Sequence, residues 1–372
     1  MRVGVPKEIK DHEDRVGLVP SSVAELVRHG HEVMVEAGAG LGAGLEDELY
    51  LAAGGRIVAT AEEIFANAEL VVKVKEPLAP ERERLRKGQV LFTYLHLAPD
   101  PDQTQDLLAS GVTAIAYETV TSPFGTLPLL TPMSEIAGRL APQVGARYLE
   151  RTSGGRGVLL GGVPGVPPAE VVVLGGGVSG THAATIALGM GATVTIVDRS
   201  AEVLRRIAVQ LPGARTIFST HDALVQVVRR ADLLIGAVLV PGAAAPKLVT
   251  REMVKTMKTA SVLVDIAIDQ GGCSETSRPT SHSHPVYVEE GVTHFCVTNM
   301  PGAVSRTSTF ALNNATLPFV LALADKGWRR AIAEDPHLRD GLNVHAGLLT
   351  CRPVAEAQGL PYTSPDQLAE KL

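Results

Sequence analysis

The sequence contains little cysteine and no long apolar run. Three cysteines occur among 372 residues, at Cys273, Cys296 and Cys351, and none belongs to a C-x-x-C pair. This scatter argues against a disulfide framework or a zinc site and favours reduced thiols in the cytoplasm. The opening MRVGVPKEIK has no apolar core like that of a signal peptide, and no run approaches 18 apolar residues. We therefore expect neither a secretory signal nor a membrane span.

An excess of positive charge is also missing. The chain has 34 Lys and Arg against 40 Asp and Glu, and the net charge of −6 at pH 7 argues against a nucleic-acid-binding surface. Hydrophobic residues make up 45% and charged residues 20% of the chain, as in a globular protein with ample core. A chain of 372 residues exceeds the size at which one core keeps growing, so two domains are expected.

The most informative segment reads EVVVLGGGVSGTHAATIALGMGATVTIVD and runs from Glu170 to Asp198. A β-branched run ends in Gly175-x-Gly177-x-x-Gly180, a small-residue helix pattern follows, and a second apolar run precedes the acid. This order is the fingerprint of a dinucleotide-binding unit. The first glycine permits a tight turn, the second lets the backbone approach a pyrophosphate, and the third lets helix and strand pack closely. The helix N-terminus then receives the anion.

Asp198 determines which dinucleotide we expect. A carboxylate at the end of the second strand accepts hydrogen bonds from the ribose hydroxyls and repels a 2′-phosphate, so NAD is favoured over NADP. Arg199 follows directly and counts against this choice, because an arginine there can accommodate a 2′-phosphate. The alternative is a glycine-rich turn without a ligand, and the combination of strand, turn, helix and acid argues against it.

Short apolar runs alternate with amphipathic segments in two parts of the chain, which is typical of a parallel sheet covered by helices. The first series fills about the first 120 residues, and the second begins at Glu170 with six strand-like runs. We predict an α/β fold of two Rossmann-like, doubly wound parallel-sheet domains with a cleft between them. The predicted NAD-binding domain spans 129–304, and the predicted substrate domain is discontinuous, with 1–128 plus 305–372.

Polar residues at strand ends are candidates for chemistry, because ligands bind outside the carboxyl ends of the strands in such sheets. Four stand out. Two cations among them suit a small carboxylate substrate, and an imidazole and a carboxylate suit proton transfer. They are Arg15 in the loop KDHEDR, Lys75 at the end of ELVVKVKE, His96 at the end of QVLFTYLHLA and Asp269 at the end of SVLVDIAID.

Each of the four also has a structural interpretation. Arg15 in a charged loop would ordinarily be solvated, and Lys75 would end its strand with the ammonium in water. Lys73 and Lys75 share strand parity, so the sequence does not distinguish between them. His96 can be a hydrogen-bonded structural residue, and Asp269 can cap the following loop.

A pair of histidines, His282 and His284 in TSHSHP, resembles a metal site only in its spacing. Neither acids nor cysteines lie nearby, and the composition is that of a loop. A solvated loop is therefore the better interpretation, and no metal is predicted.

Seven segments, in order along the chain, together resemble the alanine dehydrogenases. They read KEIKDHEDRVGLVP, VKVKEP, YLHLAP, LGGGVSG, ADLLIGAVLVPG with APKLV, VDIAIDQGGC and VTNMPGAVSRTST. The nucleotide-binding subunit of the proton-translocating nicotinamide nucleotide transhydrogenase shares the K-E-x-x-x-x-E-x-R-V pattern and the dinucleotide domain. We do not expect that subunit to keep the histidine of YLHLA, which this chain has. A saccharopine-type reductase is a further alternative with a similar two-domain cleft.

The resemblance implies a role for each matching residue. Arg15, Lys75 and Asn299 correspond to substrate-binding residues, and His96 and Asp269 correspond to the acid/base pair. Where relatives often have a basic residue near the ribose, this chain has Val203. The implied nucleotide contacts are Ser134, Gly175, Gly177, Val178, Ser179, Gly180, Asp198, Ser219, Val238, Leu239, Ile266, Arg278, Val297 and Met300.

The implied activity is reversible, NAD-dependent oxidative deamination of L-alanine to pyruvate and ammonium. The carboxylate of L-alanine would bind Arg15 and Lys75, and Asp269 or His96 would deprotonate the water that adds to iminopyruvate. One methylene is worth only about 1–3 kcal/mol of discrimination, so serine and 2-aminobutyrate are expected as secondary substrates. The implied assembly is a cytoplasmic homohexamer built through the N-terminal domain and the tail helices.

Overall fold

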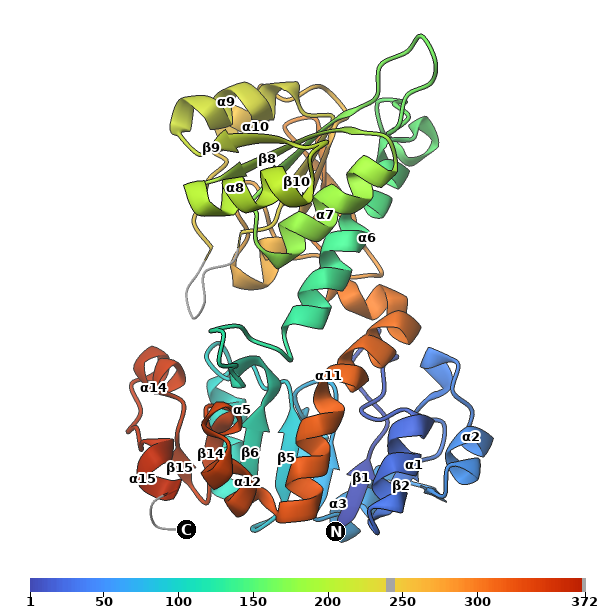
Figure 1. The fold of residues 1–372 in the computed structure, drawn as a ribbon, viewed down its shortest axis with the longest axis vertical. Helices are drawn as coiled ribbons and strands as arrows, with labels where there is room; N and C mark the ends of the chain where they lie inside the picture. Colours follow the sequence, from blue (N-terminus) through green and yellow to red (C-terminus); the bar gives the residue numbers. More distant parts are fainter. Residues whose placement is uncertain (239–244, 370–372) are drawn as a thin grey trace. The chain divides into compact units, whose positions relative to one another are not determined.

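The computed structural model describes residues 1–238 and 245–369. The chain divides into two compact units, of which unit 1 is Met1–Met133 with Val304–Leu372 and unit 2 is Ser134–Ala303. Each unit has its own mostly parallel sheet flanked by helices (Figure 1). The predicted α/β class is therefore confirmed. In the described ranges no helix is both long and apolar enough to cross a membrane.

Unit 1 contains an eight-stranded sheet with the order β15-β14-β6-β5-β4-β1-β2-β3. The strands β1 to β6 are parallel, and β14 and β15 extend the sheet in antiparallel fashion beside β6. The central strands are buried along their length, as expected when helices cover both faces. The strands are β1 (Arg2–Val5), β2 (Glu32–Glu36), β3 (Arg56–Val58), β4 (Leu70–Val72), β5 (Val90–Thr93), β6 (Thr113–Ala116), β14 (Leu342–His345) and β15 (Leu348–Leu349).

The helices of unit 1 begin at local sequence signals. The hydroxyl of Thr60 accepts a hydrogen bond from the N–H of Glu63, and Asp100 caps Gln103 in the same way before a proline in the first turn. The helices are α1 (Pro20–Arg28), α2 (Asp47–Ala52), α3 (Ala61–Asn67), α4 (Ala79–Arg82), α5 (Pro101–Ser110), α11 (Ser305–Lys326), α12 (Trp328–Glu334), α13 (Pro336–Arg339), α14 (Arg352–Gln358) and α15 (Pro365–Ala369), with 3₁₀ turns η1 (Leu41–Ala43) and η2 (Tyr117–Thr119).

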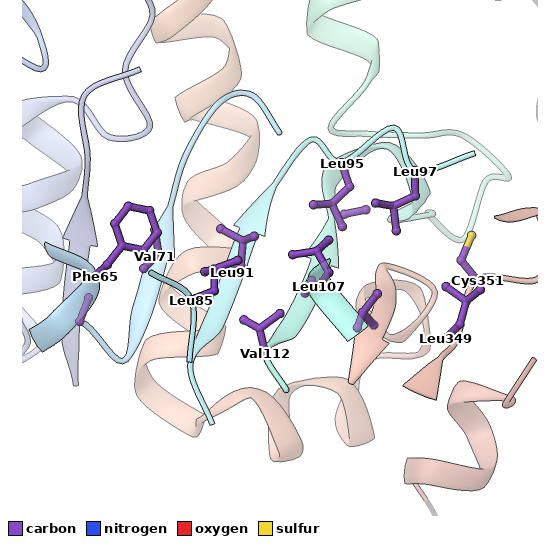
Figure 2. Close-up of a cluster of buried hydrophobic side chains, with 14 of the residues drawn as sticks. Phe65, Val71, Leu85, Leu91, Leu95, Leu97, Leu107, Val112, Leu349 and Cys351 are labelled. Atoms are coloured by element: carbon purple, nitrogen blue, oxygen red, sulfur yellow. The ribbon is translucent and has the colours of Figure 1, made fainter. Parts of the chain in front are cut away.

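A cluster of buried apolar side chains packs on one face of this sheet (Figure 2). Leu91 of β5 and Leu107 of α5 lie in it together with Leu349 and Cys351 from the C-terminal part of the chain. Each fully buried side chain of this size stabilises the fold by about 1.5–3 kcal/mol. The C-terminal segment is therefore part of the core that supports β4, β5 and the loops after them.

Unit 2 contains a seven-stranded sheet with the order β12-β13-β11-β10-β7-β8-β9. Its six parallel strands follow the doubly wound order, with the reversal between β7 and β10. The antiparallel β12 is an addition at one edge that the strand-like runs did not indicate. The strands are β7 (Glu170–Leu174), β8 (Thr193–Asp198), β9 (Arg215–Phe218), β10 (Leu233–Gly236), β11 (Val262–Asp265), β12 (Val286–Glu289) and β13 (Val292–Phe295).

The helices of unit 2 also use short polar caps, since Ser200, Thr220 and Thr250 each accept a backbone N–H three residues later. The helices are α6 (Thr131–Leu149), most of which lies in unit 2, α7 (Val178–Gly189), α8 (Ala201–Gln210), α9 (His221–Arg230) and α10 (Arg251–Lys255). The 3₁₀ turns are η3 (Arg151–Ser153), η4 (Ile266–Gln270) and η5 (Met300–Val304).

Candidate active site

Arg15 is buried, although its charged loop suggested a solvated residue. Its side chain is 1% exposed, Nε and Nη2 donate to the two carboxylate oxygens of Glu13 at 2.6 and 2.5 Å, and Nη1 lies 3.0 Å from the sulfur of Met133. Burial is the largest influence and lowers the pKa of Arg15, but the hydrogen bonds to Glu13 and the neighbouring negative charges, Glu13 first, together raise the pKa overall. The solvated interpretation is therefore wrong, and Arg15 is a fixed, permanently charged cation.

The structure separates the two lysines that the sequence left equivalent. Lys73 is fully buried, and its Nζ lies 3.0 Å from Glu8 and 2.6 Å from Glu81. Lys75 is half-buried, and its Nζ makes no hydrogen bond or ion pair with another described residue. Burial, and then the positive charge of Arg15, lower the pKa of Lys75. Lys75 is therefore the lysine available to an anionic ligand.

His96 lies on a loop in an uncommon backbone conformation, with a carboxylate beside it. Its φ is +50°, a value that few residues with a side chain adopt. Glu118 accepts the N–H groups of Leu95 and His96, the latter at 2.6 Å, and the same carboxylate lies 3.9 Å from His96 Nδ1. The ring stacks on Tyr94 at 5.7 Å, and 46% of the side chain is exposed. The imidazole is thus both oriented and accessible.

Buried neighbours anchor this loop. Leu95 and Leu97, on either side of His96, belong to the apolar cluster of unit 1, where Figure 2 shows both side chains. The hydroxyl of Tyr94 donates to the carbonyl of Leu129 at 2.6 Å. Burial raises the pKa of the Tyr94 phenol well above its usual value, so this donor keeps its proton.

The sequence suggested that Lys75 and His96 end strands, but neither does. The strand β4 stops at Val72 and β5 stops at Thr93, so each candidate lies three residues further on, in a loop. The cause differs for the two loops. The carboxylate of Glu8 accepts the N–H of Val74 at 2.7 Å, and the left-handed backbone at His96 is incompatible with a continuing strand.

These side chains gather at one edge of the unit 1 sheet. The strands β1, β4 and β5 are parallel neighbours, so the loops after them lie at the same edge. The charge of Arg15 acts on both Lys75 and Tyr94, and Tyr94 stacks on His96. We call Arg15, Lys75, Tyr94, His96 and Glu118 the substrate group. It contains the ammonium of Lys75, the guanidinium of Arg15, which is already paired with Glu13, and one imidazole that can exchange a proton.

In unit 2, the backbone conformation and packing of the protein itself require two of the three fingerprint glycines. Gly175 has φ +97°, and a Cβ at Gly180 would lie 1.8 Å from the carbonyl oxygen of Gly175. A Cβ at Gly177 would meet no atom of the described residues within 4 Å. The protein's own packing therefore does not demand a glycine at 177, whereas a pyrophosphate approaching the N-terminus of α7 would. This open space before Val178 fits a dinucleotide.

Asp198 lies beside the same turn. Its Oδ2 accepts the N–H of Gly176 and its Oδ1 accepts the N–H of Ser200, both at 2.7 Å. Each carboxylate oxygen has a second acceptor position, so the oriented acid can still receive ribose hydroxyls. Val203 packs where a Cβ of Gly176 would be, and Arg206 Nη2 donates to the carbonyl of Gly176 at 2.7 Å.

The helix α6 contributes Ser134 to this region. A Cβ at Gly138 would lie 2.2 Å from the carbonyl oxygen of Ser179, so α6 crosses the first turn of α7 in close contact. Ser134 is one turn earlier on the same face of α6. The structure thus brings Ser134 toward the glycine turn.

The remaining nucleotide-contact candidates follow the carboxyl ends of neighbouring strands in the unit 2 sheet. Arg278 lies on the segment after η4, where its guanidinium is 3.7 Å from the centre of the Tyr287 ring. Leu239 lies outside the described residues. Those that follow β9, β10, β11 and β13 are Ser219, Val238, Ile266, Val297 and Met300, and the substrate-binding candidate Asn299 also follows β13.

Asp269 does not end a strand either. The strand β11 ends at Asp265, and Asp269 is an exposed residue on the 3₁₀ turn η4. The chain turns because the buried carboxylate of Asp265 accepts the N–H groups of Ala267 at 3.1 Å and Cys273 at 2.9 Å. The predicted position of Asp269 at a strand end is wrong, and its side chain is accessible at the carboxyl edge.

The two histidines of TSHSHP differ. His282 is half-buried, and its Nε2 lies 3.1 Å from the carbonyl oxygen of Asn299, whose φ of +64° is left-handed. His284 is exposed. The solvated interpretation is therefore wrong for His282. In the part of the chain that the structure describes, no cluster of three or more metal-binding side chains occurs.

Three acidic residues of these sites were not predicted from the sequence. Glu13 stands two residues before Arg15, and an acid so close to an arginine was a usable signal. Glu118 and Asp265 carried no comparable signal. Glu118 comes from η2, 22 residues beyond His96, and Asp265 resembled the interior of an apolar run.

The two sheets and the glycine turn with its acid define a dinucleotide-binding α/β protein, whose other unit carries the substrate group. The chain matches two family models, "Alanine dehydrogenase/PNT, N-terminal domain" over residues 4–137 and "Alanine dehydrogenase/PNT, C-terminal domain" over residues 141–352. It belongs to this alanine dehydrogenase/PNT family. Membership implies a nicotinamide nucleotide as the cofactor.

Individual relatives match along nearly the whole chain. An alanine dehydrogenase of Halomonas elongata is 60% identical over 97% of this chain and 98% of its own, and one of Bacillus subtilis is 54% identical over 97% and 96%. A solved L-alanine dehydrogenase structure has a TM-score of 0.94 and 53% identity, covering 96% of this chain and 99% of that one. A transhydrogenase structure from Sinorhizobium meliloti has a TM-score of 0.83 at 26% identity, covering 94% and 100%.

Proposed function

We propose that this protein is an NAD-dependent L-alanine dehydrogenase, an oxidoreductase that reversibly converts L-alanine to pyruvate and ammonium. The observation that carries the proposal is the substrate group, because it combines a fixed guanidinium, an ammonium with no ion-pair partner among the described residues and an accessible imidazole. Similarity to alanine dehydrogenases over nearly the full chain supports it. The proposed substrates are small, charged molecules of the kind that two cations can hold.

Arg15 and Lys75 are proposed to hold the substrate carboxylate. A guanidinium locked by Glu13 is already oriented, so binding costs little additional side-chain entropy. The nicotinamide, when bound, supplies the acceptor for the hydride that leaves the α-carbon. Water then adds to iminopyruvate, and His96 or Asp269 takes a proton from that water. The adduct then collapses: its hydroxyl loses a proton as the carbonyl of pyruvate forms, the C–N bond breaks, and the protonated amino group leaves as ammonia, which takes up a proton to become ammonium.

The pH dependence of substrate binding tests the role of Lys75. Its lowered pKa means that it loses its proton below the usual range of a lysine, near 10.5, so carboxylate affinity must fall as pH rises through that lowered value. The measurement is the affinity for pyruvate in the presence of NADH, determined by calorimetry from pH 7 to about 10.5. Pyruvate is chosen because its carboxylate stays ionised over this whole range. Lys75→Arg stays charged throughout this range and should bind pyruvate with no such decline. A wild-type affinity that is flat across the range would contradict the role.

Asp198 is proposed to set the preference for NAD. In Asp198→Ala the repulsion of a 2′-phosphate is lost, so the ratio of kcat/KM for NADP to that for NAD should rise about tenfold or more, equivalent to about 1.4 kcal/mol. The exposed Arg199 would then become the attractive partner, and adding Arg199→Ala should reverse part of the gain. An unchanged ratio in Asp198→Ala would remove the basis for choosing NAD.

One assay separates the proposed function from its alternatives. The absorbance of the reduced nicotinamide is followed in three mixtures. The first contains L-alanine and NAD, the second L-lysine plus 2-oxoglutarate and NADH, and the third NADPH plus an NAD analogue. Turnover in the first mixture and in neither of the others is the expected result. Turnover only in the second mixture would indicate a saccharopine-type reductase, and turnover only in the third would indicate a transhydrogenase subunit.

The homohexamer and the cytoplasmic location belong to the same proposal. A solution mass near six times 39.1 kDa, measured by light scattering, would support the hexamer. All three cysteines are buried and free, as suits a reducing compartment.

A further inference from the structure

A single buried carboxylate closes the loop that carries Asp269. Asp265 is fully buried, its Oδ1 accepts the N–H of Ala267 at 3.1 Å, and its Oδ2 accepts the N–H of Cys273 at 2.9 Å. The loop 265–273 therefore begins and ends on the two oxygens of one side chain. Ser277 adds a third hydrogen bond, from its hydroxyl to Oδ2 at 2.5 Å.

The surroundings are shaped to admit this carboxylate. A Cβ at Gly236 would lie 2.9 Å from Oδ1, and a Cβ at Gly272 would lie 2.7 Å from Oδ2. Gly272 also has φ +78°, so an L side chain there would be strained as well as crowded. Burial, together with the charge of Asp265, raises the pKa of the Cys273 thiol. The closure thus consists of an acid, two glycines and a thiol that stays protonated.

Asp269 lies in the middle of this closed loop. It stands on η4, four residues after Asp265 and four before Cys273, and its side chain is exposed whereas the base of the loop is buried. A loop of this length without a fixed base would sample many positions, and a misplacement of about 1 Å in a reacting group can cost about 100-fold in rate. The hydrogen bonds at its base help to fix the position of the Asp269 carboxylate, together with those that the carbonyls of Gln270 and Gly271 accept from Ala245 N–H and Lys247 Nζ.

We propose that Asp265 is a positioning residue for the reaction, acting by fixing the loop that presents Asp269. This inference rests on the proposed function, in which Asp269 belongs to the acid/base pair. The geometry distinguishes it from a purely structural role, because the hydrogen bonds of Asp265 go to the two ends of this loop and to the segment that follows.

The test compares Asp265→Asn with a matched variant of another buried acid in unit 2. In Asp265→Asn one carboxylate oxygen is replaced by an NH₂ group that cannot accept a hydrogen bond, so at least one of the N–H groups of Ala267 and Cys273 loses its acceptor. The control is Asp232→Asn. Asp232 is 5% exposed, accepts the N–H of Glu170 at 2.9 Å and pairs with Lys258 at 2.9 Å, but it precedes β10 and so lies at the opposite end of the strands.

Both variants should lower Tm, and only Asp265→Asn should lower kcat, by about 10- to 100-fold. KM for L-alanine and the Kd for NADH, measured by fluorescence, should change far less than kcat. Hydrogen exchange of amides 266–273 should accelerate in Asp265→Asn and not in Asp232→Asn. Ser277→Ala keeps both backbone anchors and should retain kcat close to that of the wild type.

Two further variants make every outcome informative. If Asp265→Asn does not fold, Gly272→Ala displaces the same carboxylate without replacing it and should give the same loss of kcat. If Asp269→Asn is impaired but Asp265→Asn turns over as fast as Asp232→Asn, the positioning role is overturned and the proposed function stands. If Asp269→Asn turns over normally, the acid/base role of Asp269 is itself overturned, and the positioning role with it.

Discussion

Replacing His96 with alanine is expected to lower kcat for L-alanine oxidation by about 10²- to 10⁴-fold. The imidazole is 46% exposed, so its loss should leave Tm nearly unchanged while removing a group that exchanges a proton with the substrate. Initial rates of NADH formation at saturating L-alanine and NAD provide the measurement. His284→Ala is the matched control, because that histidine is exposed and its removal should leave kcat unaffected.

His96→Gly sharpens this test. Glycine adopts a φ of +50° without strain, so this variant should be at least as stable as the alanine variant. Imidazole added to the buffer can occupy the vacated space beside Glu118 and Tyr94 and should restore part of the lost turnover. A structural role for His96 predicts no such rescue. A His96→Ala enzyme with near-normal kcat would refute the acid/base assignment.

Replacing Gly177 with alanine is expected to weaken NADH binding about tenfold or more without unfolding the protein. The added methyl group meets no atom within 4 Å in residues 1–238 and 245–369, and φ is −70°, so the substitution should not destabilise the fold. The same methyl group occupies space that the pyrophosphate needs at the N-terminus of α7, and tenfold corresponds to about 1.4 kcal/mol. Fluorescence titration with NADH and a thermal melt separate the two effects.

Two other glycines provide the controls. At Gly180 a Cβ would lie 1.8 Å from the carbonyl oxygen of Gly175, so Gly180→Ala should lower Tm strongly as well as abolish binding. Gly189 lies at the far end of the same helix, where a Cβ would meet no atom of the described chain within 4 Å, and Gly189→Ala should bind NADH like the wild type. If Gly177→Ala binds NADH as tightly as Gly189→Ala, the anion does not approach the turn at this position.

The nucleotide half of the site could be predicted because its determinants are local. Gly175 to Gly180 and Asp198 lie within one strand–turn–helix–strand unit, whose geometry follows from φ, ψ preferences and from the short distance along the chain. The hydrogen bond from Gly176 N–H to Asp198 joins residues only 22 positions apart. The six predicted strands of this unit are all present for the same reason.

The exact ends of the strands could not be predicted. An apolar run continues through Asp265 to Asp269, and periodicity alone does not show that a buried carboxylate will accept two N–H groups and turn the chain. The same holds for Lys75 and His96, which lie in loops because Glu8 and Glu118 hold backbone N–H groups after β4 and β5. Each of these hydrogen bonds competes with strand pairing, and the competition is decided by distant groups.

The sequence by itself determined that the chain is an α/β protein with a dinucleotide turn, and which acid accompanies that turn. Only the tertiary structure decided the electrostatic state of the other candidates. Arg15 is buried on Glu13, Lys73 is neutralised by Glu8 from 65 residues away, and Lys75 is left for a ligand. The physical reason is that spacing along the chain fixes backbone geometry, whereas the pairing and burial of a charge depend on which segments the fold brings together.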